Sequence, residues 1–286
     1  MKRPQWITAG IALLLVAGLY AATSNTIFGY HPKASTAAAA PAVGDAHTNE
    51  LSIDSILFHA REGLTPRQQT RLNSLEGQLN QAGTEEKLHL NHQLARYWKD
   101  SVRVFEPYAW YTAEAARLEN SEKSLTFAAH LFLNNLKAED NPALKHWKGH
   151  QAVDLFERSL KLNPANDSAA VGLGAVYLFG NVSPNPMEGI QKIRAVVEKD
   201  STNVYAHMTL GHASVMSGQL DRALERFSTV VRLQPANLEA LLSLAETYER
   251  QGNAEQAVTW YKRSLPFANI PGLKEEVERR IKALSK

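Results

Sequence analysis

Ten histidines are the residues of this 286-residue chain whose type and spacing could hold a metal ion. His146 and His150 are four residues apart in a segment with helical character, a spacing that turns two imidazoles toward one ion. No Glu follows His146, as it would in a His-Glu-x-x-His motif, and Asp154 is two turns from His146. Asp154 is therefore too far away to share an ion with it. We predict that the chain has no metal site.

Covalent catalysis finds equally little support in the residue types. The chain has no cysteine, which excludes a cysteine nucleophile, thiolate zinc sites and iron–sulfur clusters. It also contains no Gly-x-Ser-x-Gly motif and no glycine-rich phosphate loop. Gly172 and Gly174 fall inside a helix pair, where close helix packing accounts for them. We predict a protein that is not an enzyme and that needs no cofactor.

The charge balance argues against nucleic acid as a partner. The 31 Lys and Arg residues nearly cancel the 29 Asp and Glu residues, for a net charge of +2, and no block of like charge stands out. Electrostatic binding to a phosphate backbone normally needs a basic stripe or patch. With 44% hydrophobic residues the chain has the composition of a folded protein.

The first 28 residues have the pattern of a membrane anchor. Lys2 and Arg3 precede an uncharged apolar run from Trp6 to Ala22, which would span about 25 Å as a helix. Extending the helix to Phe28 reaches the roughly 30 Å of a bilayer core. By the positive-inside rule, the two cations stay in the cytoplasm and the rest of the chain crosses the membrane. For a bacterial cell this predicts a single-pass inner-membrane protein whose body lies in the periplasm.

A cleaved signal peptide is the alternative for the same segment. Cleavage needs small residues at positions −3 and −1. Cutting after Ala21 or Ala22 would put Leu19 or Tyr20 at position −3, which favours an uncleaved anchor. Cleavage would instead leave a secreted, periplasmic protein.

Beyond the anchor, the pattern predicts a linker and then an all-α body. Residues 29–50 are small and polar, with too little apolar surface for a core, and are typical of a tether. From Leu51 onward, helix signals recur without strand alternation. Five helices are predicted before residue 163: one opened by Thr65-Pro66 and stopped at Gly83, one capped by Thr84, one begun at Pro107, and two over Ser121 to Leu136 and Pro142 to Leu162.

The second half of the chain repeats itself with a period of 34 residues. This offset takes Leu210, Gly211, Gly218, Ala223 and Phe227 to Leu244, Ala245, Gly252, Ala257 and Tyr261. Each unit reads as a helix, a tight turn and a second helix, with small residues where the helices cross and an aromatic residue beside them.

This pattern resembles the tetratricopeptide repeat. The family signature has Leu-Gly in the first helix, Ala and then an aromatic residue in the second, and a closing Pro. Leu210, Gly211, Ala223, Phe227 and Pro235 match it. The resemblance implies an α-α superhelix, a solenoid of helix-turn-helix units, over residues 121–271. We assign a divergent unit to 121–166 and further units to 167–203, 204–237 and 238–271. Residues 51–120 form an atypical helical start, and 272–286 form a capping helix.

The first helices keep a second residue stripe that packing between the helices of a pair does not use. In the tetratricopeptide family this face lines a concave groove that grips a partner, which implies a binding surface here. The candidate groove residues are Val171, Leu178, Phe179, Tyr205, Met208, His212, Met216, Leu242, Glu246 and Glu249. Apolar and Met-rich at one end and acidic at the other, such a face suits an amphipathic helix or an extended segment with a basic end.

The expected function is therefore that of a membrane-tethered scaffold that binds a protein or peptide, in the manner of envelope assembly factors or holdases. The alternative is a structural role in which the groove is filled by the chain's own terminal helices, such as 51–64. The array would then act as a spacer or form a homo-oligomer through its N-terminal helices.

Overall fold

The computed structural model describes residues 51–183 and 185–286. Within these residues the chain forms 13 α-helices and no strand, which confirms the all-helical solenoid. The helices are α2 (Ile53–Arg61), α3 (Pro66–Gln81), α4 (Thr84–Arg96), α5 (Phe105–Glu119), α6 (Glu122–Leu136), α7 (Pro142–Leu162), α8 (Asp167–Phe179), α9 (Pro186–Lys199), α10 (Val204–Met216), α11 (Leu220–Leu233), α12 (Leu238–Arg250), α13 (Ala254–Ser264) and α14 (Leu273–Leu284). A π-helical turn, η1 (Tyr97–Val102), follows α4, and a 3₁₀ turn, η2 (Leu265–Phe267), follows α13.

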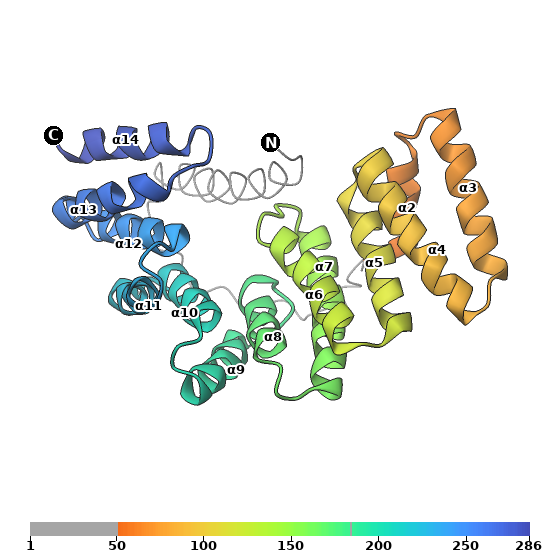
Figure 1. The fold of residues 1–286 in the computed structure, drawn as a ribbon, viewed down its shortest axis with the longest axis horizontal. Coiled ribbons are helices and arrows are strands. Elements are labelled where there is room, and N and C mark those ends of the chain that lie inside the picture. Colours follow the sequence, from red (N-terminus) through yellow and green to blue (C-terminus); the bar gives the residue numbers. More distant parts are fainter. Residues whose placement is uncertain (1–50, 184) are drawn as a thin grey trace, which may run out of the picture.

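Successive helices pack as hairpins, and the hairpins stack into a curved array. In the C-terminal half, α8, α10 and α12 lie on the inside of the curve and α9, α11 and α13 on the outside (Figure 1). The tight turns at Gly218 and Gly252 have φ values of +73° and +76°, which glycine adopts without strain. The α8–α9 connection is longer, because residues 180–185 lie between the two helices.

An asparagine begins each inner helix of the C-terminal half. The side chains of Asn166, Asn203 and Asn237 accept hydrogen bonds from the backbone N–H groups of Ala169, Ala206 and Ala240, at 2.9, 2.9 and 3.0 Å. Each bond satisfies a helix N–H that has no partner within the helix. The caps therefore set the start of α8, α10 and α12 at nearly the same point in every repeat.

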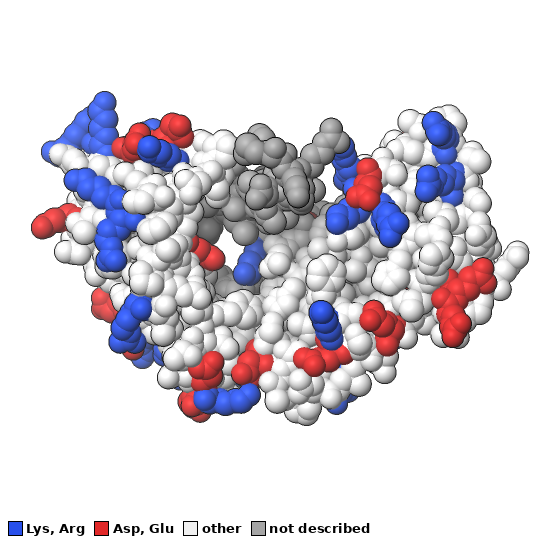
Figure 2. Space-filling view, in the orientation of Figure 1, with Lys and Arg blue, Asp and Glu red and all other residues white. Residues whose placement is uncertain are grey.

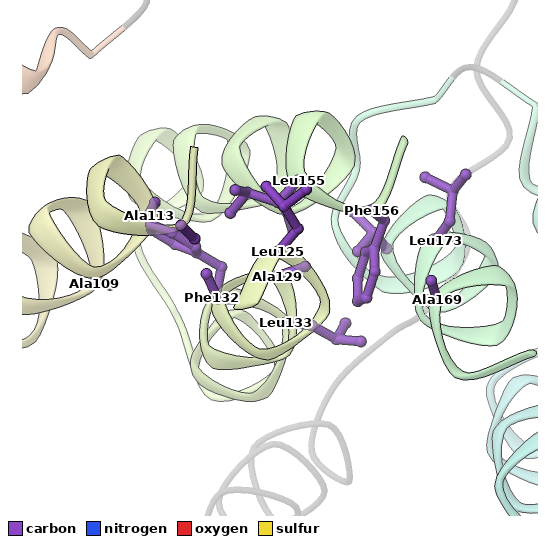
Figure 3. Packing of buried hydrophobic residues seen from close by; sticks show 14 of the residues in the cluster. Ala109, Ala113, Leu125, Ala129, Phe132, Leu133, Leu155, Phe156, Ala169 and Leu173 are labelled. Atoms are coloured by element: carbon purple, nitrogen blue, oxygen red, sulfur yellow. The ribbon is translucent and has the colours of Figure 1, made fainter. Parts of the chain in front are cut away.

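The core confirms the predicted pairing of small and aromatic residues. A Cβ added to Gly172 would overlap the ring of Phe156, and one added to Gly211 would overlap the ring of Phe227. Phe156 points from α7 toward Ala169 and Leu173 of α8 (Figure 3). Ala245 and Tyr261 occupy the matching positions one repeat later, and both are buried. Each aromatic ring thus lies in a space left by a missing or short side chain.

The N-terminal helices follow the prediction in part. Helix α3 begins as expected, with Thr65 and Gln68 forming a reciprocal capping box. The Thr84 cap is wrong, because Gly83 is the N-cap residue of α4 and its lack of a side chain leaves no capping hydrogen bond. Helix α5 begins at Phe105, two residues before Pro107, since a proline needs no N–H partner anywhere in the first turn.

Helix α2 does not fill the inside of the curve, which corrects the suggestion that 51–64 occupies the groove. Ile56 is buried in the same cluster as Ala109 and Ala113 of α5, and Arg61 pairs with Glu76 of α3 at 2.6 Å. Helix α2 therefore packs with the other N-terminal helices, because its apolar side chains are buried against α5.

The C-terminal helix confirms the predicted cap. Leu273 and Val277 of α14 are buried, while Ile281 and Leu284 pack against the same cluster. The last repeat is thereby covered by one amphipathic helix.

One cation is buried at the junction of α5, α6 and α7. Lys148 is 1% exposed, and its Nζ lies 2.8 Å from Glu106 and 2.5 Å from Glu139. Burial alone would raise the pKa of the Glu139 carboxyl, but hydrogen bonds from Lys148 and the Asn141 backbone outweigh it and hold the pKa below its ordinary value. The ammonium group of Lys148 therefore compensates the negative charges of both Glu106 and Glu139.

Replacing Gly172 by Ala tests the small–aromatic contact. The added methyl group must displace the Phe156 ring, so Gly172→Ala should lower the free energy of unfolding by about 1–3 kcal/mol. Gly77→Ala is the matched control, because a Cβ at Gly77 on α3 meets no atom within 4 Å. Urea unfolding should show the control unchanged or up to about 1 kcal/mol more stable. Equal stability of the two variants would contradict the packing argument.

Lys148→Met tests the buried ion pairs and their pH dependence. At pH 7 the variant should lose about 3–5 kcal/mol, because two carboxylates are left without their cation. The folded-state pKa of Glu139 is lowered, so its contribution is present above about pH 4.3 and is lost as the pH falls further. Urea unfolding at pH 7 and pH 4 should show the deficit shrinking in acid. Lys161→Met, exposed on the same helix, should change stability by less than about 0.5 kcal/mol.

Candidate partner-binding surface

The inner helices line a hollow on the concave side of the array. Figure 2 shows the hollow, whose visible wall is mostly uncharged with charged side chains of both signs along it. The side chains that face it come from α6, α8, α10 and α12, because in each hairpin the opposite side of the first helix packs against its partner. This surface is called the concave face below.

Contacts between non-adjacent helices define the concave face. The Nζ atom of Lys137, at the end of α6, lies 5.8 Å from the ring centroid of Phe179 on α8. The His130 ring of α6 lies 5.6 Å from the Tyr205 ring of α10, centroid to centroid. These contacts bring three successive hairpins onto one surface.

The concave face holds ionisable groups in two neighbouring places. Burial and the charge of Lys137 lower the pKa of His130 to about 4, so this imidazole is neutral at pH 7. His212 Nε2 lies 3.1 Å from Glu239 Oε1. The hydrogen bond from His212 and the charges of His212 and Lys137 hold the pKa of Glu239 below its ordinary value, although burial of the carboxylate acts to raise it.

Glu246 is different, because it has no hydrogen-bond partner among the described residues. Its side chain is half-buried, and burial raises its pKa, with Arg280, Arg250 and His212 acting in the other direction. A carboxylate in this position would gain more from a cationic partner than a fully hydrated one.

The predicted groove residues fall into three groups. Met216 is exposed at 68%, one helical turn beyond His212 on α10. Partly buried are Leu178, Phe179, Tyr205, His212, Leu242, Glu246 and Glu249. Val171 and Met208 are buried, the latter at 6% exposure.

Val171 and Met208 therefore need correction as groove residues. Val171 belongs to the core between α8, α9 and α10, with Ile193 and Leu210. Met208 belongs to the next core, with Phe227 and Leu241. Both side chains are buried in contacts between helices, so they are not accessible to a partner.

Glu249 is held by the C-terminal helices. Its Oε2 accepts hydrogen bonds from the Tyr261 hydroxyl at 2.7 Å and from Arg280 Nη1 at 2.9 Å. Arg280 also pairs with Glu276. This carboxylate ties α12 to α13 and α14, so its charge is largely compensated.

Sequence analysis missed two residues of the concave face, His130 and Lys137. The signal for them was the pair Phe127 and Asn134 on α6, which are two helical turns apart and exposed. Lys137 follows the last residue of the helix predicted over Ser121 to Leu136, so helical periodicity does not assign it to a face.

Across residues 51–183 and 185–286, no three His, Asp or Glu side chains are grouped so that they could hold one metal ion. None of the helices in the described part of the chain is both long and apolar enough to cross a membrane. The anchor predicted at 1–28 and the linker at 29–50 lie outside the described residues.

Comparison with known sequences supports the repeat prediction. Residues 208–272 match the tetratricopeptide repeat family. RNA polymerase-associated protein CTR9 of Saccharomyces cerevisiae (strain ATCC 204508 / S288c) is 21% identical in a 197-residue alignment that covers 59% of this chain and 18% of that protein. The chain thus aligns with about a fifth of that relative's length.

Solved structures include several similar helical arrays. TTC0263, a thermophilic TPR protein of Thermus thermophilus, is 15% identical with a TM-score of 0.49, covering 71% of this chain and 99% of that one. MamA of Desulfovibrio magneticus RS-1 is 21% identical with a TM-score of 0.44, covering 66% and 99%. YrrB, a TPR protein with an unusual peptide-binding site, is 18% identical with a TM-score of 0.40, covering 65% and 97%.

Removing Arg280 tests the tie between Glu249 and the cap. Arg280→Met should loosen α14 by about 1–2 kcal/mol, because a charge-assisted hydrogen bond and an ion pair are lost. Hydrogen exchange should speed up in residues 277–284 and leave α6 to α10 unchanged. The control is Arg279→Met, since Arg279 is 66% exposed and pairs only locally with Glu276. Faster exchange in both variants alike would contradict a specific role for Arg280.

Proposed function

We propose that this chain, whose residues 208–272 carry tetratricopeptide repeats, is a membrane-tethered scaffold that binds a protein segment on its concave face. Tetratricopeptide repeats generally act by protein–protein interaction and not by catalysis. The observation that carries the proposal is the convergence of α6, α8, α10 and α12 on one surface that combines the exposed Met216 with the under-compensated carboxylate of Glu246.

The apolar part of the surface supports binding by burial. Met216 is largely exposed, and Leu178 and Phe179 are partly exposed. Apolar side chains of this size are more often buried in the core of a soluble protein. Apolar side chains gathered on a concave surface commonly mark interaction sites. The flexible side chain of Met216 can adapt to partners of different shape.

The charges of the surface indicate the polarity of the partner. Glu246 provides under-compensated negative charge on α12, whereas the charge of Glu239 is already balanced in part by His212 and by Lys137, which lies near Phe179. An amphipathic helix or extended segment with a basic end near α12 satisfies both features.

The membrane tether is part of the same proposal. Lys2 and Arg3 before the apolar run Trp6 to Ala22 support a single-span anchor at 1–28, with residues 29–50 as a linker. The scaffold would then work in the periplasm, at the inner membrane of a bacterial cell, as an assembly factor or holdase. Signal cleavage would instead release it as a periplasmic protein.

Site-specific photo-crosslinking tests the surface in cells. A photoreactive residue in place of Met216, on α10, should give a discrete crosslinked partner in full-length protein. One in place of Met187 should not, because Met187 is 52% exposed but belongs to the outer helix α9. In the non-photoreactive pair, Met216→Glu should reduce partner recovery at least tenfold and Met187→Glu should not. Protease added to intact spheroplasts should digest the body of the protein if the tether orients it outward.

Two outcomes would contradict binding on the concave face. Crosslinks from both positions alike, or partner recovery unchanged by Met216→Glu, would mean that the concave face is not the binding surface. A crosslink from Met216 to a second copy of the chain would favour the self-associating spacer. Thermal unfolding of each variant should match the wild type, since both substituted side chains are exposed.

A further inference from the structure

A histidine pair lies on α7, away from the concave face. His146 and His150 are one helical turn apart, and their Nε2 atoms approach to 3.1 Å. Their ring centroids are 4.3 Å apart, with the ring planes at 69°. The helical spacing alone does not require this approach, because each side chain could extend separately into solvent.

The separation of the two nitrogens matches that of two ligands on one metal ion. With Zn–N bonds of about 2.0–2.1 Å, two nitrogens 3.1 Å apart subtend an angle of about 100° at the ion. This angle lies between the tetrahedral and octahedral values. The distance between the two Nε2 atoms therefore fits one ion, which would replace the proton that the rings now share.

The pair opens into a pocket with room for further ligands. The pocket has a volume of about 360 Å³ and is lined by Leu51, Ile53, Trp110, Trp147, Gln151 and the two histidines. Trp110 and Trp147 form its aromatic wall, with ring centroids 6.5 Å apart. Water molecules can complete the coordination of an ion on the pocket side.

The nearby polar side chains that could act as further metal ligands are already engaged by other residues. Asp154 is engaged by Arg117 at 2.9 Å and by Arg158 at 2.8 Å, so its carboxylate is already compensated. Gln151 Oε1 accepts a hydrogen bond from Arg117. Within the described residues, the protein ligands are therefore the two imidazoles alone, in agreement with the lack of a three-residue cluster.

We propose that His146 and His150 form a two-imidazole site for a transition-metal ion of the Zn²⁺, Ni²⁺ or Cu²⁺ class, with water in the remaining positions. Imidazole nitrogen suits these ions, whereas Mg²⁺ and Ca²⁺ prefer oxygen ligands. The sequence argued against this site because it lacks the third ligand of known motifs. The structure adds the converging nitrogens and the adjoining pocket, and the site is independent of the concave face.

An ion bound here would link two successive turns of α7 beside Leu51 and Ile53, where the helical body begins. Binding to the folded state alone stabilises it by mass action. The nearby indoles of Trp110 and Trp147 provide a built-in optical signal, since Ni²⁺ and Cu²⁺ quench tryptophan emission at short range.

The test is a titration of the full-length protein, purified without a histidine tag and treated with chelator. ZnCl₂ followed by calorimetry should bind one ion per chain, and NiCl₂ should quench tryptophan emission with the same stoichiometry. His146→Ala and His150→Ala should each weaken binding at least tenfold. The matched control is His89→Ala with His92→Ala, because these exposed histidines lie three residues apart on α4 without a contact between their rings.

Several outcomes would overturn the proposal. Unchanged affinity in His146→Ala or His150→Ala, or an equal loss in the α4 control, would show that binding is not at this pair. The lack of one-to-one binding at 100 µM ZnCl₂ would mean that this histidine pair is not a metal site. Circular dichroism should show the same helix content in all variants, which separates loss of the site from loss of the fold.

Discussion

The close approach of neighbouring helices, made possible by small residues, is the constraint on which this fold depends. Gly172, Gly211 and Ala245 remove side-chain volume on one helix, and an aromatic ring from another helix fills the space. The contact fixes how far apart the helices lie and how they cross. Such contacts occur within a hairpin, between Gly211 of α10 and Phe227 of α11, and between hairpins, between Gly172 of α8 and Phe156 of α7. The stacked hairpins form a curved array (Figure 1).

Curvature in turn creates the concave face. Lys137 and Phe179, or His130 and Tyr205, belong to different hairpins and meet only because the inner helices converge. The outer helices diverge by the same geometry, which leaves residues such as Met187 separated on the convex side. The difference between the two sides arises from the stacking and not from any single hairpin.

The period of 34 residues predicts the repeat helices, the turns at Gly218 and Gly252, and the pairing of Gly211 and Ala245 with Phe227 and Tyr261, because all of these depend on local spacing. It could not predict which of Val171, Met208 and Met216 is accessible, since that depends on how far the next hairpin overlaps each position. Nor could it predict the bond between Glu249 and Arg280, which are 31 residues apart and belong to different units. The N-terminal helices lack the repeat, and there the starts of α4 and α5 were misplaced.

The bond between Glu249 and Arg280 also shapes the electrostatic potential inside the curve. A guanidinium from the chain's own last helix neutralises the final carboxylate of α12, so the negative potential is centred earlier on that helix, near Glu239 and Glu246. The C-terminal helix therefore acts as an internal counter-ion as well as a cover. A chain shortened before residue 280 would carry a hollow with its most negative point shifted by about one helical turn.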